Sequence, residues 1–309
     1  MEIIAGTLDF ELNKATAVAI GKFDGLHLGH RKLIEQVLQK QSEGLTPCVL
    51  TFDPSPAIFF GFSDGKELNT AQEKRDILEQ MGVEVLMEFP MTAETATMPP
   101  EVFVEEILVN KLHTKWIVAG TDVSFGDKGA GDAVLLERLS EKFGYQLTTI
   151  DKVMYEGEEI SSTRIRKHLM QGDMQYVEKL LGTPYTIEGE VVHGKALGRK
   201  MGMPTVNILP SLNKLMPPCG VYFSKVFAEG KVYAGISNIG YKPTVNKEPV
   251  LGVETYIYDF SGDLYDKTIK ISLLAFKRPE MQFSTIEELK QQMEDDINVG
   301  KMYHLLKNG

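Results

Sequence analysis

Apolar runs and helical patterns alternate over the first half of the chain, from residue 17 to about residue 150. Continuous apolar runs, typical of strands covered on both faces, predict strands at 17–20, 47–52, 83–89, 116–119 and 146–150. Apolar residues at helical spacing predict helices at 31–41, 71–81, 100–112 and 133–143. This alternation predicts an α/β domain with a doubly wound parallel sheet, in which ligands bind beyond the carboxyl ends of the strands.

The pattern changes after one more predicted helix, 173–181, which Gly182 and Pro184 end. The next segment, 185–276, has short β-rich runs separated by glycine, proline and asparagine turns, which predict a small antiparallel β-barrel. Its clearest strands are expected at 221–227, 231–236, 253–260 and 268–274. A final helix at 285–306 carries an apolar stripe that we expect to pack on the barrel, formed by Ile286, Leu289, Met293, Ile297 and Tyr303. The sequence therefore predicts two domains, 1–183 and 184–309.

The composition is that of an ordinary globular protein, with 309 residues of which 43% are hydrophobic and 25% charged. A formal net charge of −10 without a basic tail argues against binding to nucleic acid. No apolar run approaches the roughly 18 residues of a membrane span, and the N-terminus lacks a signal-peptide pattern. Cys48 and Cys219 form neither a metal motif nor a disulfide framework. We therefore expect a soluble cytoplasmic protein with no membrane partner; the sequence leaves its oligomeric state undetermined.

The most informative stretch, GKFDGLHLGH, follows the first predicted strand and ends at His30. Gly21, Gly25 and Gly29 mark a turn whose backbone can come close to a ligand. A helix beginning near Gly29 would direct its free N–H groups and positive dipole end at this turn, which favours an anion. His27 and His30 can both donate hydrogen bonds to phosphate oxygens. Zinc is less well supported because no third ligand has the usual spacing. Taken alone, the motif is explained equally well by a solvated helix start.

A second polar stretch, ISSTRIR at 160–166, precedes an amphipathic helix. Its hydroxyl side chains, including Ser161 and Thr163, would cap that helix whatever the function. Arg164 and Arg166 lie in the first turn, where the helix dipole disfavours cations. Their presence there indicates an anionic partner.

In the second half, Thr205 and Asn207 are two apart, so an extended segment would project a hydroxyl and an amide oxygen from one face. Such oxygens suit Mg²⁺ bound to ATP phosphates, although a turn also explains these residues. Glu254 has the default interpretation of an exposed carboxylate on a strand. The nearby run GEVVHGKA, 189–196, is not a P-loop, because Ala196 offers no hydroxyl for magnesium.

Taken together and in this order, the motifs resemble those of prokaryotic bifunctional riboflavin kinase/FAD synthetases, over essentially the whole chain. GKFDGLHLGH and ISSTRIR resemble the nucleotidyltransferase signatures, and GTDVSFG, 120–126, resembles the G-x-D/N-F-x-F-G element. GEVVHGKALGRKMGMPTVN, 189–207, resembles the riboflavin kinase pattern, and FKRPEMQF, 276–283, resembles its flavin-side loop. The resemblance implies a nucleotidyltransferase domain followed by a kinase barrel with a terminal helix.

For the first domain, the resemblance implies adenylyl transfer, in which the phosphate of FMN attacks the α-phosphorus of ATP and pyrophosphate leaves. It implies that His27 and His30 hold ATP phosphates as the catalytic residues. In such a reaction, positioning of the two substrates and neutralisation of the phosphate charge supply most of the reduction of the activation barrier. The other implied contacts are Gly21, Phe23, Asp24, Gly29, Ser161, Thr163 and Arg166 for the nucleotide, and Asp122 and Phe125 for the flavin.

For the second domain, the resemblance implies phosphorylation of riboflavin, with ATP as co-substrate and Mg²⁺ as cofactor. Glu254 would take the proton of the ribityl 5′-hydroxyl as that oxygen attacks the γ-phosphorus. Thr205 and Asn207 would bind the metal. The other implied contacts are Gly194, Lys195 and Gly198 for the nucleotide, and Arg278 and Phe283 for the flavin.

Three departures from the family pattern keep alternatives open. Ser55 stands where a histidine is usual, Val123 replaces an aromatic residue, and Thr121 also departs. They motivate the alternative of a riboflavin kinase with a weak or inactive adenylyltransferase domain. A non-catalytic flavin-binding regulator is a further alternative, which the intact Thr205 and Glu254 argue against. A HIGH-type tRNA synthetase fragment would share the H-x-G-H motif, but its RNA binding is disfavoured by the acidic charge.

Overall fold

A computed structural model describes residues 1–194, 197–242 and 250–308, and the chain divides into two compact units, Met1–Ser162 and Thr163–Gly309. Lys195, which the resemblance assigns to the nucleotide, lies outside the described residues. The division falls before α6 (Ser162–Met170) and α7 (Met174–Leu181) rather than after them. It falls there because α7 packs against the strands β9 and β14 of the second unit.

The first unit is built on a parallel sheet of six strands in the order β1-β4-β3-β2-β5-β6. The strands are β1 (Glu2–Ala5), β2 (Thr16–Ile20), β3 (Thr46–Asp53), β4 (Val85–Pro90), β5 (Thr114–Gly120) and β6 (Gln146–Ile150). The predicted doubly wound sheet is therefore confirmed. The edge strand β1 was not predicted, because it is short and only one of its four residues is buried.

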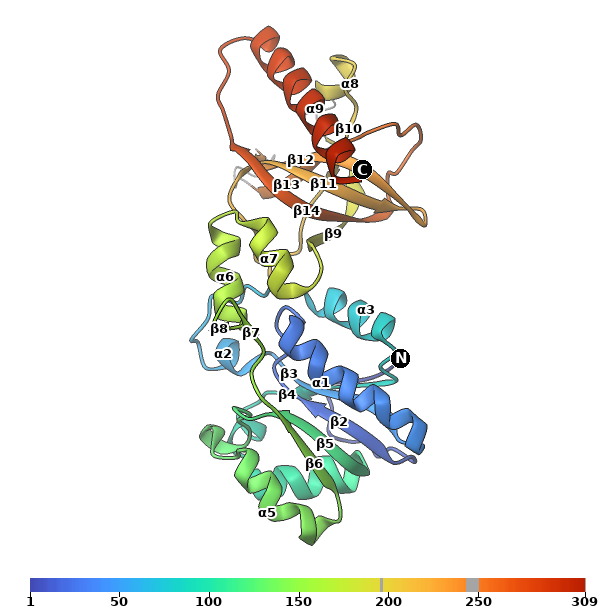
Figure 1. The fold of residues 1–309 in the computed structure, drawn as a ribbon, viewed down its shortest axis with the longest axis vertical. Helices are drawn as coiled ribbons and strands as arrows, with labels where there is room; N and C mark the ends of the chain where they lie inside the picture. The colour runs from blue at the N-terminus through green and yellow to red at the C-terminus, as the bar shows by residue number, and fades with distance from the viewer. Residues whose placement is uncertain (195–196, 243–249, 309) are drawn as a thin grey trace. The chain divides into compact units, whose positions relative to one another are not determined.

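Helices cover both faces of this sheet (Figure 1). On one face, α1 (Leu28–Gln39) and α3 (Ala71–Met81) pack in one apolar cluster with strand residues such as Ala19 and Val49. On the other face lie α5 (Ala133–Phe143) and the π-helical segment η3 (Phe103–Lys111), which continues α4 (Pro100–Val102). The remaining short elements of this unit are η1 (Lys40–Glu43), α2 (Pro56–Phe59), η2 (Thr95–Thr97), η4 (Asp127–Gly129), β7 (Met154–Tyr155) and β8 (Glu158–Glu159).

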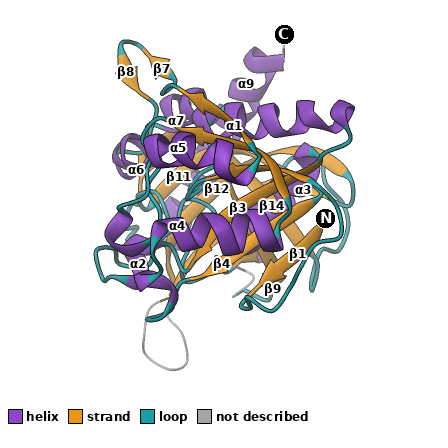
Figure 2. Ribbon diagram, turned by 90° about the horizontal axis from the view of Figure 1, so that it is seen from below, coloured by secondary structure: helices purple, strands orange, loops and turns teal. Residues whose placement is uncertain are grey.

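The second unit contains a closed barrel in the order β10-β13-β12-β11-β14-β9, with every neighbouring pair antiparallel. The long strands β11, β12 and β14 are prominent in Figure 2. Its elements are β9 (Tyr185–Val192), α8 (Leu197–Lys200), β10 (Thr205–Ile208), β11 (Gly220–Ala228), β12 (Lys231–Lys242), β13 (Val250–Ile257), β14 (Thr268–Pro279) and α9 (Ile286–Asn308). The predicted antiparallel barrel is confirmed.

The terminal helix α9 packs on the barrel through only part of the predicted stripe. Met293, Ile297 and Tyr303 join one apolar cluster with barrel residues such as Phe223. Ile286, in contrast, is 66% exposed, so its expected place in the packed stripe was wrong. The reason is that the first turn of α9 begins before the helix reaches the barrel (Figure 1). Within the described residues, no helix combines the length and apolar character needed to cross a membrane.

Candidate functional site

The loop between β2 and α1 folds tightly beyond the carboxyl end of β2. Phe23 and Leu26 are fully buried although their φ angles, +48° and +43°, lie in the left-handed region, and Gly25 between them has φ +88°. Such a backbone costs a non-glycine residue about 1–2 kcal/mol, which burial of both side chains offsets here. Asp24 ties the loop to the segment before α3, because its Oδ1 accepts a hydrogen bond from the Leu68 N–H at 2.8 Å.

The two histidines of this loop lie against each other. His27 is the N-cap residue of α1, and its Nδ1 accepts a hydrogen bond from the His30 N–H at 3.4 Å. The two imidazoles stack with ring centroids 3.7 Å apart. Gly29 makes room for this arrangement, since a Cβ at that position would lie 3.1 Å from His27 Cε1. The structure therefore brings both imidazoles together at the edge of the sheet where the sequence predicted a ligand.

Burial keeps both imidazoles neutral at pH 7. Desolvation lowers the pKa of His27 from 6.5 to about 4, although Asp24 and Asp122 act in the opposite direction. Burial, together with the nearby His27 and Lys74, holds the pKa of His30 well below its usual value. Each ring therefore has a single N–H donor, and the proton of His27 lies on Nε2 because Nδ1 is an acceptor. Within the described part of the chain, His30 Nδ1 is buried without a hydrogen-bond partner.

An aromatic cavity of about 440 Å³ lies at the same edge of the first unit. Phe125, which the sequence assigned to the flavin, is 2% exposed, lines this cavity and packs against Phe103 with ring centroids 5.3 Å apart. The sequence analysis missed most of the lining. The missed residues include Lys22, Phe52, Phe60, Phe62, Phe89 and Lys128. The aromatic run FFGF at 59–62 was the available signal in the sequence. In the structure, Phe62 of this run is 84% exposed.

Asp122 follows β5 and lies close enough to His27 for its charge to act on that imidazole. Its side chain is 64% exposed, and its Oδ2 is 3.4 Å from Lys152 Nζ. The negative charge of Asp122 acts on His27 and offsets part of the lowering of the His27 pKa that burial causes. Gly120 allows the carboxylate to fold back over the end of β5, since a Cβ there would meet Asp122 Oδ1 at 2.8 Å.

The ISSTRIR stretch divides between the two units. Ser162 ends the first unit, and its Oγ donates a hydrogen bond to the Asp24 carbonyl oxygen at 2.8 Å. Arg164 belongs to the second unit, where its guanidinium donates to the Tyr176 hydroxyl and lies 5.3 Å from the centre of that ring. Arg164 therefore has an aromatic partner within the protein, which the sequence did not predict. Thr163 is exposed and Arg166 is partly buried, both in the second unit.

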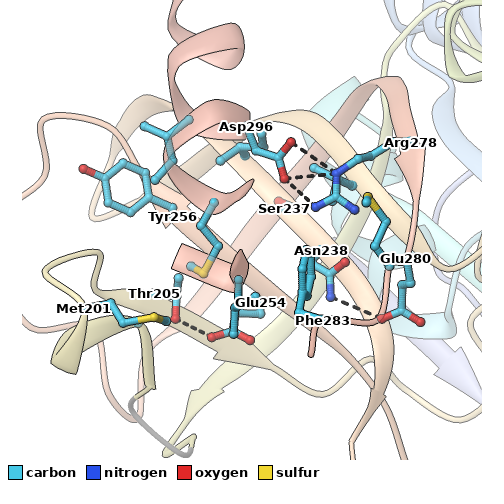
Figure 3. Close-up of a pocket in the computed structure, with 17 residues that line it drawn as sticks. Met201, Thr205, Ser237, Asn238, Glu254, Tyr256, Arg278, Glu280, Phe283 and Asp296 are labelled. Atoms are coloured by element: carbon cyan, nitrogen blue, oxygen red, sulfur yellow. Dashed lines mark hydrogen bonds and ion pairs between the residues drawn. The ribbon is translucent and has the colours of Figure 1, made fainter. Parts of the chain in front are cut away.

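In the barrel, Glu254 is not an isolated surface carboxylate. Thr205 on β10 donates a hydrogen bond from Oγ1 to Glu254 Oε1 at 2.5 Å, and the two side chains point toward each other in Figure 3. Asn207 is 7% exposed and pairs with Glu254 across β10 and β13. The register of two neighbouring strands thus brings together the predicted metal ligands Thr205 and Asn207 and the predicted base Glu254.

Two of the predicted glycines allow close packing against β10. A Cβ at Gly194 would lie 2.7 Å from Asn207 Nδ2. A Cβ at Gly198 would lie 2.3 Å from the Met203 carbonyl oxygen and 3.4 Å from Thr205 Oγ1. The glycine-rich segment therefore passes directly beside the Thr205 and Asn207 side chains.

Two cavities of the second unit meet at β10 and β13. The first, about 260 Å³, is lined by Glu254 and by Arg278 and Phe283, both assigned to the flavin from the sequence. The second, about 520 Å³, is lined by Arg199, Pro204, Val206, Asp259, Phe260, Tyr265 and others. Thr205 and Tyr256 line both. The two cavities therefore have Thr205 and Tyr256 as a common wall.

A β-bulge directs two cations from β14 toward α9. Val221 pairs with Arg278 and Tyr222 pairs with Phe276, so Lys277 is an extra residue on β14. Lys277 Nζ lies 2.5 Å from Asp296 Oδ1, and Arg278 Nη2 lies 2.5 Å from Asp296 Oδ2. Burial raises the pKa of Asp296, but the hydrogen bonds from Arg278 and Lys277 outweigh it, so the pKa is lowered overall. Figure 3 shows the contact between Arg278 and Asp296 at the wall of the smaller cavity.

We expect Asp296→Ala to destabilise the second unit by about 3 kcal/mol, because two half-buried cations lose their common partner. The pKa of Asp296 is lower in the folded protein, so its contribution is complete above the usual value of 3.8 and disappears as pH falls through the folded value. Hydrogen exchange measured on the full chain should show faster exchange in β14 and α9 and no change in the first unit. The control is Asp295→Ala at the exposed neighbouring position; equal exchange in both variants would contradict the prediction.

Comparison with known proteins identifies the family of this chain. The family model described as FAD synthetase matches residues 9–164, and the one described as riboflavin kinase matches residues 181–304. A bifunctional riboflavin kinase/FMN adenylyltransferase of Listeria monocytogenes is 36% identical over 93% of this chain and 91% of its own length. The enzyme of the same name from Bacillus subtilis is 37% identical over 91% of this chain and 90% of its own length.

A solved structure supports the fold of both units. A crystal structure titled macrolide-efflux protein from Streptococcus pneumoniae matches with a TM-score of 0.84 and 29% identity, over 97% of this chain and 98% of that one. Two adjoining family matches and relatives of nearly equal length establish that this chain belongs to the bifunctional riboflavin kinase/FMN adenylyltransferase family.

Proposed function

We propose that the chain makes FAD from riboflavin in two ATP-consuming steps, with riboflavin phosphorylated in the barrel and FMN adenylylated at the parallel sheet. The family supports both activities and does not favour the alternatives of an inactive first domain or a non-catalytic regulator. The observation that carries the proposal for the barrel is the meeting of its two cavities at Thr205, beside Glu254.

In the kinase step, riboflavin occupies the smaller cavity between Phe283 and Arg278, and ATP occupies the larger cavity near Arg199. Glu254 accepts the proton of the ribityl 5′-hydroxyl as that oxygen attacks the γ-phosphorus. The new P–O bond forms as the bond between the γ-phosphorus and the β,γ-bridging oxygen breaks, and ADP leaves. The hydrogen bond from Thr205 orients the carboxylate before the substrate arrives.

The donor set beside Glu254 fits Mg²⁺. Thr205 and Asn207 offer a hydroxyl and an amide oxygen, and magnesium is commonly held by few protein oxygens together with substrate phosphates. Among the described residues, no group of three or more His, Cys, Asp or Glu side chains forms an alternative metal site. When bound, the ion would neutralise charge on the ATP phosphates, while Gly194 and Gly198 keep the approach to these side chains open.

In the adenylyl transfer step, the flavin ring of FMN occupies the aromatic cavity that Phe125 lines, with Lys22 and Lys128 as cations for its phosphate. ATP phosphates contact the single N–H donors of His27 and His30 at the N-terminus of α1. A phosphate oxygen of FMN bonds to the α-phosphorus, the bond from that phosphorus to the departing pyrophosphate breaks, and no enzyme nucleophile is needed. Gly21, Phe23, Asp24 and Gly29 shape the loop around this site.

Several assignments stay predictions from the resemblance. These are the nucleotide contacts of Ser161, Thr163 and Arg166, the flavin contact of Asp122, and a functional boundary between 183 and 184. We also propose a cytoplasmic location, supported by the need for ATP and by the free thiols of Cys48 and Cys219.

The test is incubation of the purified full chain with magnesium and ATP, and with either riboflavin or FMN, followed by chromatography of the products. FMN from riboflavin and FAD from FMN are the expected results. FMN without FAD would instead support the weak or inactive first domain motivated by Ser55, Thr121 and Val123. Neither product would refute the proposal and support a flavin-binding regulator.

A further inference from the structure

A buried lysine on α3 takes no part in the function described so far. Lys74 is the fourth residue of α3, and it is only 6% exposed. Its position is well defined, because Thr70 and Glu73 form a capping box at the start of the helix. The Glu73 N–H donates to Thr70 Oγ1 at 3.2 Å, and the Thr70 N–H donates to Glu73 Oε2 at 2.9 Å.

The arrangement of α1 and α3 directs Lys74 toward the histidines. Both helices follow parallel strands and pack on the same face of the sheet, so both begin at its carboxyl edge. Lys74 lies one turn before Leu78, and His30 lies one turn before Ile34. Leu78 and Ile34 belong to the same apolar cluster between the helices. Lys74 and His30 therefore occupy equivalent first-turn positions on facing sides of two neighbouring helices.

The charges around this point are unbalanced. Among the described residues, no carboxylate lies within ion-pair distance of Lys74, although the lysine is almost fully buried and sits in a helical turn that disfavours cations. Its positive charge reaches His30, whose pKa it lowers. His30 Nδ1, also buried, has no hydrogen-bond partner in the described chain. A buried cation and an unpartnered imidazole nitrogen near two helix starts are the groups that a bound anion would contact.

We propose that Lys74 binds the phosphate chain of ATP during adenylyl transfer and supplies a fixed positive charge beside His27 and His30. The ammonium group contacts oxygens of the departing pyrophosphate, where negative charge grows as the bond to the α-phosphorus breaks. This assignment rests on the proposed FAD synthesis and adds to it a phosphate-binding residue outside all the recognised motifs.

The experiment compares Lys74→Met, Lys74→Arg and the control Lys32→Met, which removes an exposed lysine from α1. We expect Lys74→Met to lower kcat/KM for ATP in FAD formation by about 30-fold, as loss of one charged hydrogen bond does. We expect Lys74→Arg to retain most of the activity and Lys32→Met all of it. FMN formation from riboflavin should be unchanged in all three variants, which separates failure of this inference from failure of the whole enzyme.

Two further measurements exclude a purely structural role. Inhibition of FAD formation by inorganic pyrophosphate should weaken in Lys74→Met by a factor similar to the loss in kcat/KM. The melting temperature of this variant should not fall, because methionine replaces a buried charge with an apolar chain of similar length. FAD formation equal to that of Lys32→Met would overturn the inference, as would equal losses in the Met and Arg variants or unchanged inhibition by pyrophosphate.

Discussion

Replacement of Glu254 by glutamine is expected to lower FMN formation from riboflavin by about 10³-fold, the usual size of a general-base contribution. The amide has nearly the shape of the carboxylate and can still accept the hydrogen bond from Thr205. It cannot take up the proton of the ribityl hydroxyl, so the attacking oxygen is no longer activated. Initial rates with riboflavin at saturating magnesium and ATP measure the effect.

FAD formation from FMN by the same variant is the internal control, because that reaction belongs to the first unit. Glu229→Gln is the matched variant, since Glu229 is an exposed carboxylate between β11 and β12 that contacts Lys267. We expect both controls to behave as the unmodified chain. FMN formation by Glu254→Gln at the rate of Glu229→Gln would remove Glu254 from the role of base.

His30→Ala is expected to lower FAD formation from FMN by about 10²-fold and to leave FMN formation intact. The substitution removes one positioned hydrogen-bond donor from the triphosphate site, and the loss of such a donor typically has this size. It also removes the ring that stacks on His27 at 3.7 Å. Measured initial rates at varied ATP should therefore show both a lower kcat and a higher KM.

His113→Asn is the control for this variant. His113 is another histidine of the first unit, with a half-exposed side chain 3.3 Å from Glu11. Its φ of +48° is tolerated by asparagine better than by alanine. Equal loss of FMN and FAD formation in His30→Ala would contradict the assignment of the two reactions to separate sites.

The architecture was largely accessible from the chain itself. Helices 71–81 and 133–143 were predicted from apolar spacing with the observed ends, and in the structure a polar cap precedes each and a glycine follows each. Thr70 and Asp132 accept hydrogen bonds from the first helical turns, and Gly82 and Gly144 take left-handed conformations after the last. Local signals were weaker for β1, which is short and mostly exposed. For α9 the helix start was predicted within one residue, and only the burial of Ile286 was wrong.

The candidate sites were accessible only where a motif is contiguous. His27, Gly29 and His30 stand close together in the chain, and so do Thr205 and Asn207. The aromatic cavity was missed because its walls come from elements far apart in the chain, including Phe60, Phe89 and Lys128. The sequence also could not show that Arg164 contacts Tyr176, because that contact depends on how α6 and α7 pack.

By itself, the sequence determined most of the strands and helices of the first unit, since apolar periodicity and caps act over a few residues. It also determined the motifs that indicated phosphate chemistry. Only the tertiary structure decided that the charge of Lys74 acts on His30, that Thr205 touches Glu254, and that a bulge turns Lys277 toward Asp296. These contacts join residues far apart in the chain, so they depend on strand order, register and the packing of helices on a sheet.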